Sequence, residues 1–286
     1  EERAFGALSH DAGLRSERQE IAPEAALGLE PYSDTALSGS VGARWALGDS
    51  TRLVLNLTSS GRHPTATELY ADGPHLAVQR FEVGDRALGV ERGRNADLAL
   101  RVAGDGWRGS LSLFVSDYTG FIYPQPTGAF EDGLPQVQYT ATEARFSGAE
   151  FELEAPAYEP RAGRLTGRLF GDLVRAEDGG GAPLPQVPPR RLGAGLEFER
   201  AALRVGVEAI WHDAQDRLAA TALPTTGFTL LSTDVSWRIP AWGRGMLLFV
   251  RGANLLDEDA RRHASPLKDR APLAGRSLSA GVRFDF

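Results

Sequence analysis

The segment Leu278-Ser-Ala-Gly-Val-Arg-Phe-Asp-Phe286 alternates apolar and polar side chains without interruption. Successive side chains of a β-strand point to opposite faces of the sheet, so this alternation predicts a strand. One face of such a strand requires apolar surroundings, and the other requires water. The apolar face would carry Leu278, Ala280, Val282, Phe284 and Phe286.

The same period of two recurs along the rest of the chain, in shorter or noisier form. These segments are six to ten residues long and approach the ~9 to 11 residues with which a tilted strand crosses a lipid bilayer. We find no long segment with helical periodicity. The pattern predicts an all-β, antiparallel architecture of about 12 strands. The other segments are 8–15, 36–45, 52–57, 97–102, 107–115, 149–154, 163–170, 192–198, 203–209, 230–237 and 245–250.

The connections between these segments come in two lengths. Short polar turns, such as 47–50, 103–106 and 199–201, alternate with much longer connections. Short periplasmic turns and long extracellular loops are typical of a transmembrane β-barrel. We therefore interpret residues 1–286 as one barrel architecture without domain linkers. The long connections are 62–93, 119–136, 175–190, 212–226 and 257–274.

Composition removes several classes of function. The formal net charge is −7, so the chain has no basic field to attract nucleic acid. There is no cysteine, which excludes disulfides, thiolate catalysis and the usual structural zinc sites. Phosphate-binding, dinucleotide-binding and nucleophile-elbow motifs are also missing, so we do not expect an enzyme.

We expect no helical membrane span, and the first residues do not resemble a leader peptide. No run approaches the roughly 18 to 20 apolar residues that a spanning helix needs. The first residues, EERAFGALSH, lack the basic and apolar regions of a signal peptide. Because the chain opens on Glu1 and not on methionine, we expect it to be either processed or, as we favour, the tail of a longer protein.

A soluble β-sandwich or propeller is the alternative architecture. The polar faces of the strands carry many charges, which suits a water-filled lumen. Glu150, Glu152 and Glu154 share one such face, and we interpret them as partners of Arg164 and Arg168, not as a catalytic acid pair. Aromatic residues near strand ends also suit a membrane interface. These are Trp45, Trp107, Tyr118, Trp211, Trp237 and Trp242.

Residues 62–98 contain two blocks with a recognisable spacing. They read RHPTATELYADGPH from Arg62 to His75, then FEVG from Phe81, then ERGRNADL from Glu91. The blocks resemble the R-x-P-x-x-x-E-L-Y and F-x-x-G-N-x-x-L-x-x-E motifs of TonB-dependent outer-membrane receptors, with Asp85 where the family more often has asparagine. The motif residues are Arg62, Pro64, Glu68, Leu69, Tyr70, Gly73, Pro74, Phe81, Glu82 and Gly84.

The C-terminal part agrees with this resemblance. Asn254-Leu255 resembles the N-L motif of the family's penultimate strand. Phe284 and Phe286 resemble the terminal aromatic signal that the barrel-assembly machinery is understood to recognise. Together with residues 260–276, the ELYADGPH segment is most similar to the zinc-uptake branch of the family.

The resemblance implies a fold and a function. The family barrel has 22 strands, so residues 1–286 would supply about 12 C-terminal strands, without the plug domain. The implied function is uptake of a metal ion such as zinc, or of a metal chelate or siderophore. It would occur in the outer membrane of a Gram-negative bacterium, with energy from the TonB complex acting on the plug. Lipid and the barrel-assembly machinery would be further partners. A non-transporting adhesion or structural barrel and a soluble binding module remain alternatives.

The histidines allow two interpretations. His63, His75, His212 and His263 lie in predicted loops beside carboxylates, and imidazole and carboxylate both suit zinc. In the first interpretation they capture zinc transiently. In the second, which we favour, they are solvated side chains of ordered turns, and Arg62 or Glu68 forms an ion pair in the lumen. No cofactor is expected apart from such a transient zinc ion.

Overall fold

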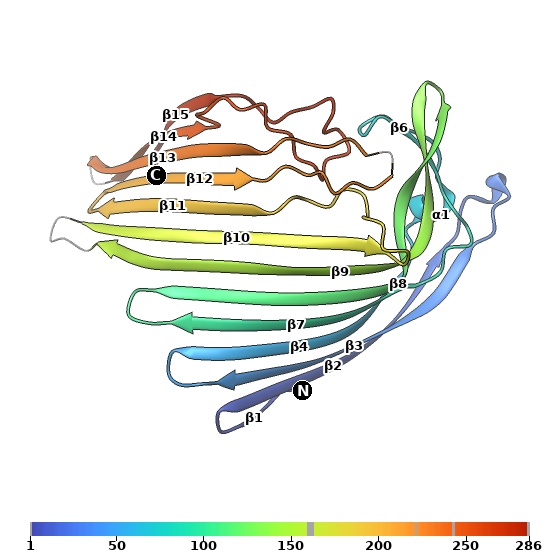
Figure 1. The fold of residues 1–286 in the computed structure, drawn as a ribbon, viewed down its shortest axis with the longest axis horizontal. Coiled ribbons are helices and arrows are strands. Elements are labelled where there is room, and N and C mark those ends of the chain that lie inside the picture. Colours follow the sequence, from blue (N-terminus) through green and yellow to red (C-terminus); the bar gives the residue numbers. More distant parts are fainter. Residues whose placement is uncertain (1, 159–162, 221, 242–243, 285–286) are drawn as a thin grey trace.

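A computed structural model describes residues 2–158, 163–220, 222–241 and 244–284 (Figure 1). It contains fifteen strands in one sheet, one short α-helix and one 3-10 turn. Their bounds are β1 Glu2–Phe5, β2 Leu8–Ile21, the 3-10 turn Ala25–Leu27, β3 Tyr32–Ala46, β4 Thr51–Arg62, α1 Ala66–Tyr70, β5 Asp72–His75, β6 Arg80–Val83, β7 Glu91–Ala103, β8 Arg108–Glu131, β9 Leu134–Tyr158, β10 Arg164–Asp178, β11 Arg191–Arg200, β12 Leu203–His212, β13 Phe228–Ala241, β14 Arg244–Ala253 and β15 Ser277–Phe284.

The strands form a single-layered wall in which sequence order is also spatial order. Each strand from β1 to β15 is antiparallel to the next, and only β5 and β6 leave this path. The wall is open, because in the described residues β1 and β15 are its two edges. The prediction of an all-β antiparallel sheet is confirmed. The soluble sandwich is wrong, because a sandwich needs two packed sheets.

Short and long connections lie at opposite ends of the wall. The short turns after β3, β7 and β11 are on the left of Figure 1, and the long connections are on the right. This asymmetry confirms the predicted alternation. The long connections, which we call the loop end, are 22–31, 63–90, 179–190, 213–227 and 254–276.

One predicted long loop is wrong. Residues 119–136 are not a loop, because β8 and β9 continue as a hairpin far beyond their neighbours (Figure 1). The hairpin closes at Asp132-Gly133, where φ is 49° and 74°. Asp-Gly suits this two-residue turn, which requires positive φ at both positions. The three prolines of this segment concealed the strands, since proline is rare inside sheets.

The two faces of the wall differ as the alternation predicts. Leu98 and Leu100 of β7 lie opposite Leu113 and Leu111 of β8, and all four side chains are exposed on an apolar face. The other face is charged, and ion pairs cross it from strand to strand. No helix in the described part of the chain is long and apolar enough to cross a membrane.

Ion pairs on the charged face link strands that are separate in sequence. The guanidinium group of Arg168 donates to Glu152 at 2.9 Å and to Glu208 at 3.4 Å. The pairing of Arg168 with Glu152 confirms the prediction. Glu154 pairs with Arg108 on the preceding strand at 2.7 Å, a partner that was not predicted. A hollow of about 570 Å³ on this face is lined by these groups and by Arg164.

Phenylalanine rings lie over glycines on the charged face. Each ring lies against the backbone of the directly opposite residue in the next strand, where a Cβ would be too close to the ring. Only glycine at these positions leaves room for the ring to contact the backbone of the next strand. The pairs are Phe114 with Gly148, Phe170 with Gly193, and Phe249 with Gly281.

We expect Gly148→Ala to lower the stability of the wall by about 1–3 kcal/mol, the usual cost of overpacking. The new Cβ would collide with the Leu173 backbone oxygen and with the Phe114 ring, and the backbone cannot easily yield. Thermal unfolding followed by circular dichroism measures the effect. Gly167→Ala is the matched control, since its nearest heavy atom would be 3.8 Å away. Equal melting temperatures for the two variants would contradict the packing argument.

Candidate functional site at the loop end

The segment 62–91, which we call the motif segment, folds back against the wall after β4. Its helix α1 buries Leu69, which is 1% exposed, and the cluster around it includes Leu88 and Ile122. Gly84 approaches the helix so closely that a Cβ would lie 2.6 Å from the Tyr70 backbone nitrogen. The F-x-x-G motif therefore has a packing explanation: only glycine allows this approach.

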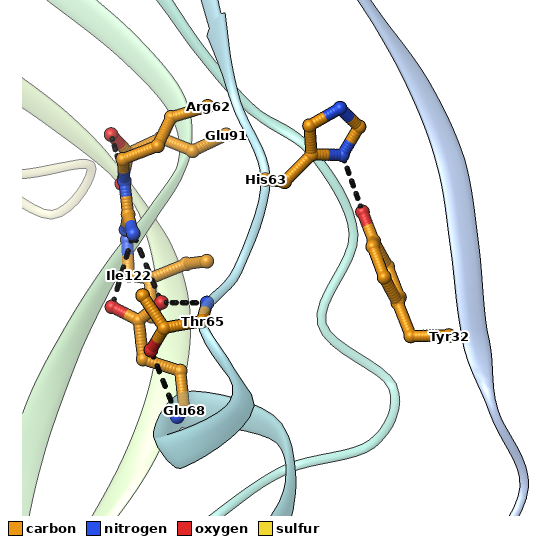
Figure 2. A network of polar contacts seen from close by, with 7 residues as sticks. All are labelled: Tyr32, Arg62, His63, Thr65, Glu68, Glu91 and Ile122. Atoms are coloured by element: carbon orange, nitrogen blue, oxygen red, sulfur yellow. Dashed lines mark hydrogen bonds and ion pairs between the residues drawn. The ribbon is translucent and has the colours of Figure 1, made fainter. Parts of the chain in front are cut away.

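Arg62 is the centre of a polar network at this fold-back (Figure 2). Its guanidinium group donates to Glu91 at 3.2 and 3.0 Å, and to Glu68 at 2.9 Å. Glu91 also accepts the backbone N–H of Ile122 at 2.9 Å. The network joins the end of β4, the start of α1, β7 and the extended hairpin. The prediction that Arg62 or Glu68 forms an ion pair is confirmed, and the two residues pair with each other.

Glu68 has a second role at the start of α1. Its carboxylate accepts the backbone N–H of Thr65 at 2.7 Å, and its own N–H donates to the Thr65 hydroxyl at 3.2 Å. This reciprocal capping box stabilises a helix that is otherwise too short to be stable. The spacing R-x-P-x-x-x-E therefore couples a helix cap to the ion pairs of the wall.

His63 is buried, so the interpretation of this histidine as solvated is wrong. It is 6% exposed, and both ring nitrogens have partners. Nδ1 lies 3.0 Å from the Tyr32 hydroxyl (Figure 2), and Nε2 lies 3.2 Å from the Glu17 carbonyl oxygen. Because the carbonyl can only accept, Nε2 donates and Nδ1 accepts from the tyrosine. His63 thus ties the motif segment to β2 and β3.

His75 and Glu82 belong to the small β5–β6 hairpin. Glu82 is buried and accepts from Arg80 at 2.7 Å and from His75 Nδ1 at 3.0 Å. Burial alone would raise the pKa of Glu82, but the hydrogen bonds from His75 and Arg80 lower it below its ordinary value. The hairpin pairs in parallel with β9, with Phe81 opposite Gln136. Gly73 and Pro74 shape its other strand.

His263 lies in a polar cluster that fastens two long loops together. Its Nδ1 is 3.0 Å from the Thr225 hydroxyl and 3.3 Å from Lys268 Nζ. Lys268 also donates to the Leu223 carbonyl oxygen at 2.5 Å. We call Thr225, His263 and Lys268 the loop clasp. All three side chains are buried, so the interpretation of His263 as solvated is also wrong. Burial, and then the neighbouring Lys268, lower the pKa of His263 to about 4.

The other predicted site residues make contacts that connect loops and strands of the fold. Asn254 closes the base of the loop 254–276, donating to the carbonyls of Glu258 and Ala274 at 2.9 and 3.1 Å. Leu255 follows it and bonds back to β13. His212 stacks on Phe228 with ring centroids 4.5 Å apart.

Of the two aromatic residues of the predicted barrel-assembly signal, one lies among the described residues. Phe284 is half exposed on β15, opposite Met246 of β14. Phe286 lies outside the described residues.

The structure does not bring the histidines together. Across the described ranges, no three His, Cys, Asp or Glu side chains gather to hold a metal ion. The zinc ligand set therefore stays a prediction. Sequence reasoning also missed Tyr32, Thr225 and Lys268 as partners of histidines. A signal existed for Lys268, since it is the chain's only lysine among 31 basic residues.

We expect Arg62→Met to destabilise the protein by about 2–3 kcal/mol, because it leaves the buried Glu91 carboxylate without its cation. The control is Arg108→Met, which breaks the exposed pair with Glu154 and should cost less than about 1 kcal/mol. Denaturant unfolding measures both. If Arg62→Met cost no more than its control, the network would not stabilise the fold-back.

Acidification should open the loop clasp. The pKa of His263 is lower in the folded loops than its ordinary 6.5, so the stabilisation is complete above that pH and is lost as pH falls towards about 4. The protonated ring would face Lys268, with Asp269 as the nearby carboxylate. Hydrogen exchange of residues 213–227 and 254–276, corrected for intrinsic rates, should show the loss. In His263→Gln it should not depend on pH in this window; an unchanged pH dependence would assign it to another group.

Comparisons with known proteins agree with this fold. The family model described as TonB dependent receptor-like, beta-barrel, matches residues 3–255. The copper transporter OprC superimposes with a TM-score of 0.80 at 22% identity, over 99% of this chain and 46% of that chain. The FrpB iron transporter from Neisseria meningitidis gives 0.75 at 14% identity, over 100% and 44%. A mutant of the ferric enterobactin receptor PfeA from Pseudomonas aeruginosa, with enterobactin bound, gives 0.69 at 17% identity, over 98% and 43%.

The chain thus spans less than half the length of these solved structures. At these identities the structures show a shared fold, whereas the family model covers most of the sequence. Members of that family are transporters and not enzymes, and they are β-barrel proteins of the outer membrane of Gram-negative bacteria. On the match over residues 3–255 and the wall described above, this chain belongs to the TonB-dependent receptor family as part of its β-barrel.

Proposed function

We propose that this chain is the C-terminal wall of an outer-membrane transporter that imports a scarce metal, as an ion such as zinc or as a metal chelate. The observation that carries the proposal is the wall itself. Its apolar face suits lipid, and its charged face suits a wet lumen. Solved structures with the same fold are named as transporters of copper and iron and as a receptor for ferric enterobactin.

The other partners follow from family membership. We propose that a plug domain occupies the lumen against the charged face, and that TonB acts on it with energy from the inner membrane. Lipid would cover the apolar face, where Leu98, Leu100, Leu111 and Leu113 lie. The barrel-assembly machinery would read the strand that carries Phe284 and the residue Phe286.

For zinc, we propose that the loop histidines act as transient capture ligands, and that they differ in how readily they can bind the metal. His63 and His263 would have to break buried hydrogen bonds before they could bind a metal. His75 is more available, since its side chain is 49% exposed, with Glu82 as a neighbouring carboxylate. Neutral imidazole and carboxylate suit zinc. His75 is therefore the first residue to test.

Uptake by cells tests the transport function. We expect radioactive zinc, or an iron chelate, to accumulate only in cells that carry the full-length receptor, and to stop accumulating when a protonophore collapses the proton gradient. A calorimetric titration of the purified receptor with zinc, repeated with His75→Gln, tests the capture ligands. Accumulation of neither substrate would favour a structural or adhesion barrel. The absence of zinc binding would leave only the chelate.

A further inference from the structure

The outer half of the β8–β9 hairpin has one edge that no strand covers. β7 pairs with β8 only as far as Thr119, and in the described part of the chain no other strand continues on that side. The opposite edge differs, because β6 pairs in parallel with β9 at residues 136–138. Residues 121–131 of β8 therefore form an edge strand that extends beyond the wall (Figure 1). We call these residues the open edge.

An open edge strand invites pairing with another molecule. Its outward backbone N–H and C=O groups can bind a strand from a second chain, and proteins usually oppose this with charged side chains or with proline. Residues 121–130 read FIYPQPTGAF and contain no charged side chain. Aromatic and β-branched residues such as Phe121, Ile122 and Tyr123 favour strand pairing. Side-chain charge therefore does not protect this part of the open edge.

The register shows which residues face the open edge. In an antiparallel pair, the N–H and C=O groups of alternate residues point towards the partner strand, and those of the residues between them point away. The N–H of Ile122 points away from β9, because it donates to the carboxylate of Glu91 on β7 at 2.9 Å. The pairing of β8 with β9 is regular from Phe121 to Pro126. Residues 122, 124 and 126 therefore direct their backbone groups outwards.

Each of these three outward positions lacks a free N–H. The N–H of Ile122 is occupied by Glu91, whose carboxylate is held in turn by Arg62 at 3.0 Å. Positions 124 and 126 are both proline, which has no N–H. Proline is tolerated in a sheet where its nitrogen faces an open edge. From residue 121 to residue 126 the open edge thus presents carbonyl oxygens without a free donor between them.

The missing donors would be needed for pairing between two copies of the chain. If two open edges ran antiparallel about Gln125, residue 124 of one copy would lie opposite residue 126 of the other. Such a pair exchanges two N–H···O=C bonds, and symmetry would supply a second pair. With proline at both positions none of these four bonds can form. The two prolines lie where they prevent the symmetric pairing most directly.

We propose that Pro124, Pro126 and Glu91 close the open edge to strand addition, and that the edge would otherwise join a second copy of this chain through antiparallel β8–β8 pairing. Residues 121–130 carry strand-forming side chains without charge, so the protection lies in the backbone donors. The inference goes beyond the proposed transport function and does not depend on the substrate.

Self-association of the full-length receptor in detergent micelles tests the proposal. The double variant Pro124→Thr/Pro126→Thr restores both outward N–H groups in each copy, and threonine suits a strand. Sedimentation velocity over a range of concentrations measures the association. We expect the double variant to associate at least about tenfold more strongly than the unaltered receptor, because four added hydrogen bonds act together.

Two further variants control for the loss of proline. Pro188→Thr/Pro189→Thr replaces two consecutive prolines that lie outside the strands, and it should leave the association unchanged. Pro126→Thr alone restores one outward N–H in each copy, so its effect should be smaller than that of the double variant. The single variant also keeps the test valid if the double variant misfolds, which circular dichroism would show.

A cross-link locates the contact. In the symmetric pairing, Gln125 would lie opposite Gln125 of the second copy, with Cα atoms about 4.5 Å apart, within disulfide range. Residues 1–286 contain no cysteine, so Gln125→Cys introduces a defined thiol. Mild oxidation should link at least about fivefold more receptor when Gln125→Cys is combined with the double variant than when it is present alone.

The outcomes are distinct. If the double and single variants associated no more strongly than the unaltered receptor, some other feature would protect the edge and the proposal would be overturned. Equal association of the Pro188→Thr/Pro189→Thr control would overturn it as well. Association without the cross-link at residue 125 would refute the β8–β8 pairing. Transport does not enter these measurements, so their failure would leave the proposed function untouched.

Discussion

The structure depends on one constraint: in a single-layered sheet, the backbone N–H and C=O groups must form hydrogen bonds with the neighbouring strands of the same sheet. Among the described residues no second sheet lies above or below the wall, so each strand pairs with its neighbours, and along the main path from β2 to β14, which leaves out β5 and β6, every strand is paired on both sides. Unpaired backbone groups are costly away from water, and within lipid only closed pairing is tolerated. Because the ladder also fixes the alternation of side chains, the wall acquires an apolar face and a charged face in the same step.

The side chains of the charged face pack against one another without a hydrophobic core. Arg168 shows how this occurs, since its guanidinium group lies 4.4 Å from the Phe170 ring centroid while it bonds to Glu152 and Glu208. The ring in turn lies over Gly193. Individually such exposed pairs contribute little, but across strands they form a network of charges that stays hydrated. Glycine inside these strands is thus a packing requirement.

In the part of the chain that the structure describes, the buried hydrophobic clusters form at the loop end, where segments fold over the wall. Leu69 and Ile122 are buried together there, and a second cluster surrounds Ala176 and Leu184. The ion pairs of Arg62 bring α1 to the first cluster, and the capping box allows so short a helix to persist. The receptor motif therefore gives the loop end a packed interior, against which the neighbouring segments lie.

The period of two by itself predicted most strand positions and the two faces, because alternation is a local property of the backbone. The outer-membrane character followed from the resemblance of residues 62–98 to a family motif. The period of two also predicted the pairing of Arg168 with Glu152, since neighbouring strands in a meander are near in sequence. The extended hairpin was missed because its prolines outweighed the Asp132-Gly133 turn. Only the tertiary structure decided that His63 is buried and that Arg270 meets Gln79. Such contacts join residues far apart in the chain, and no local pattern specifies which loops will meet in space.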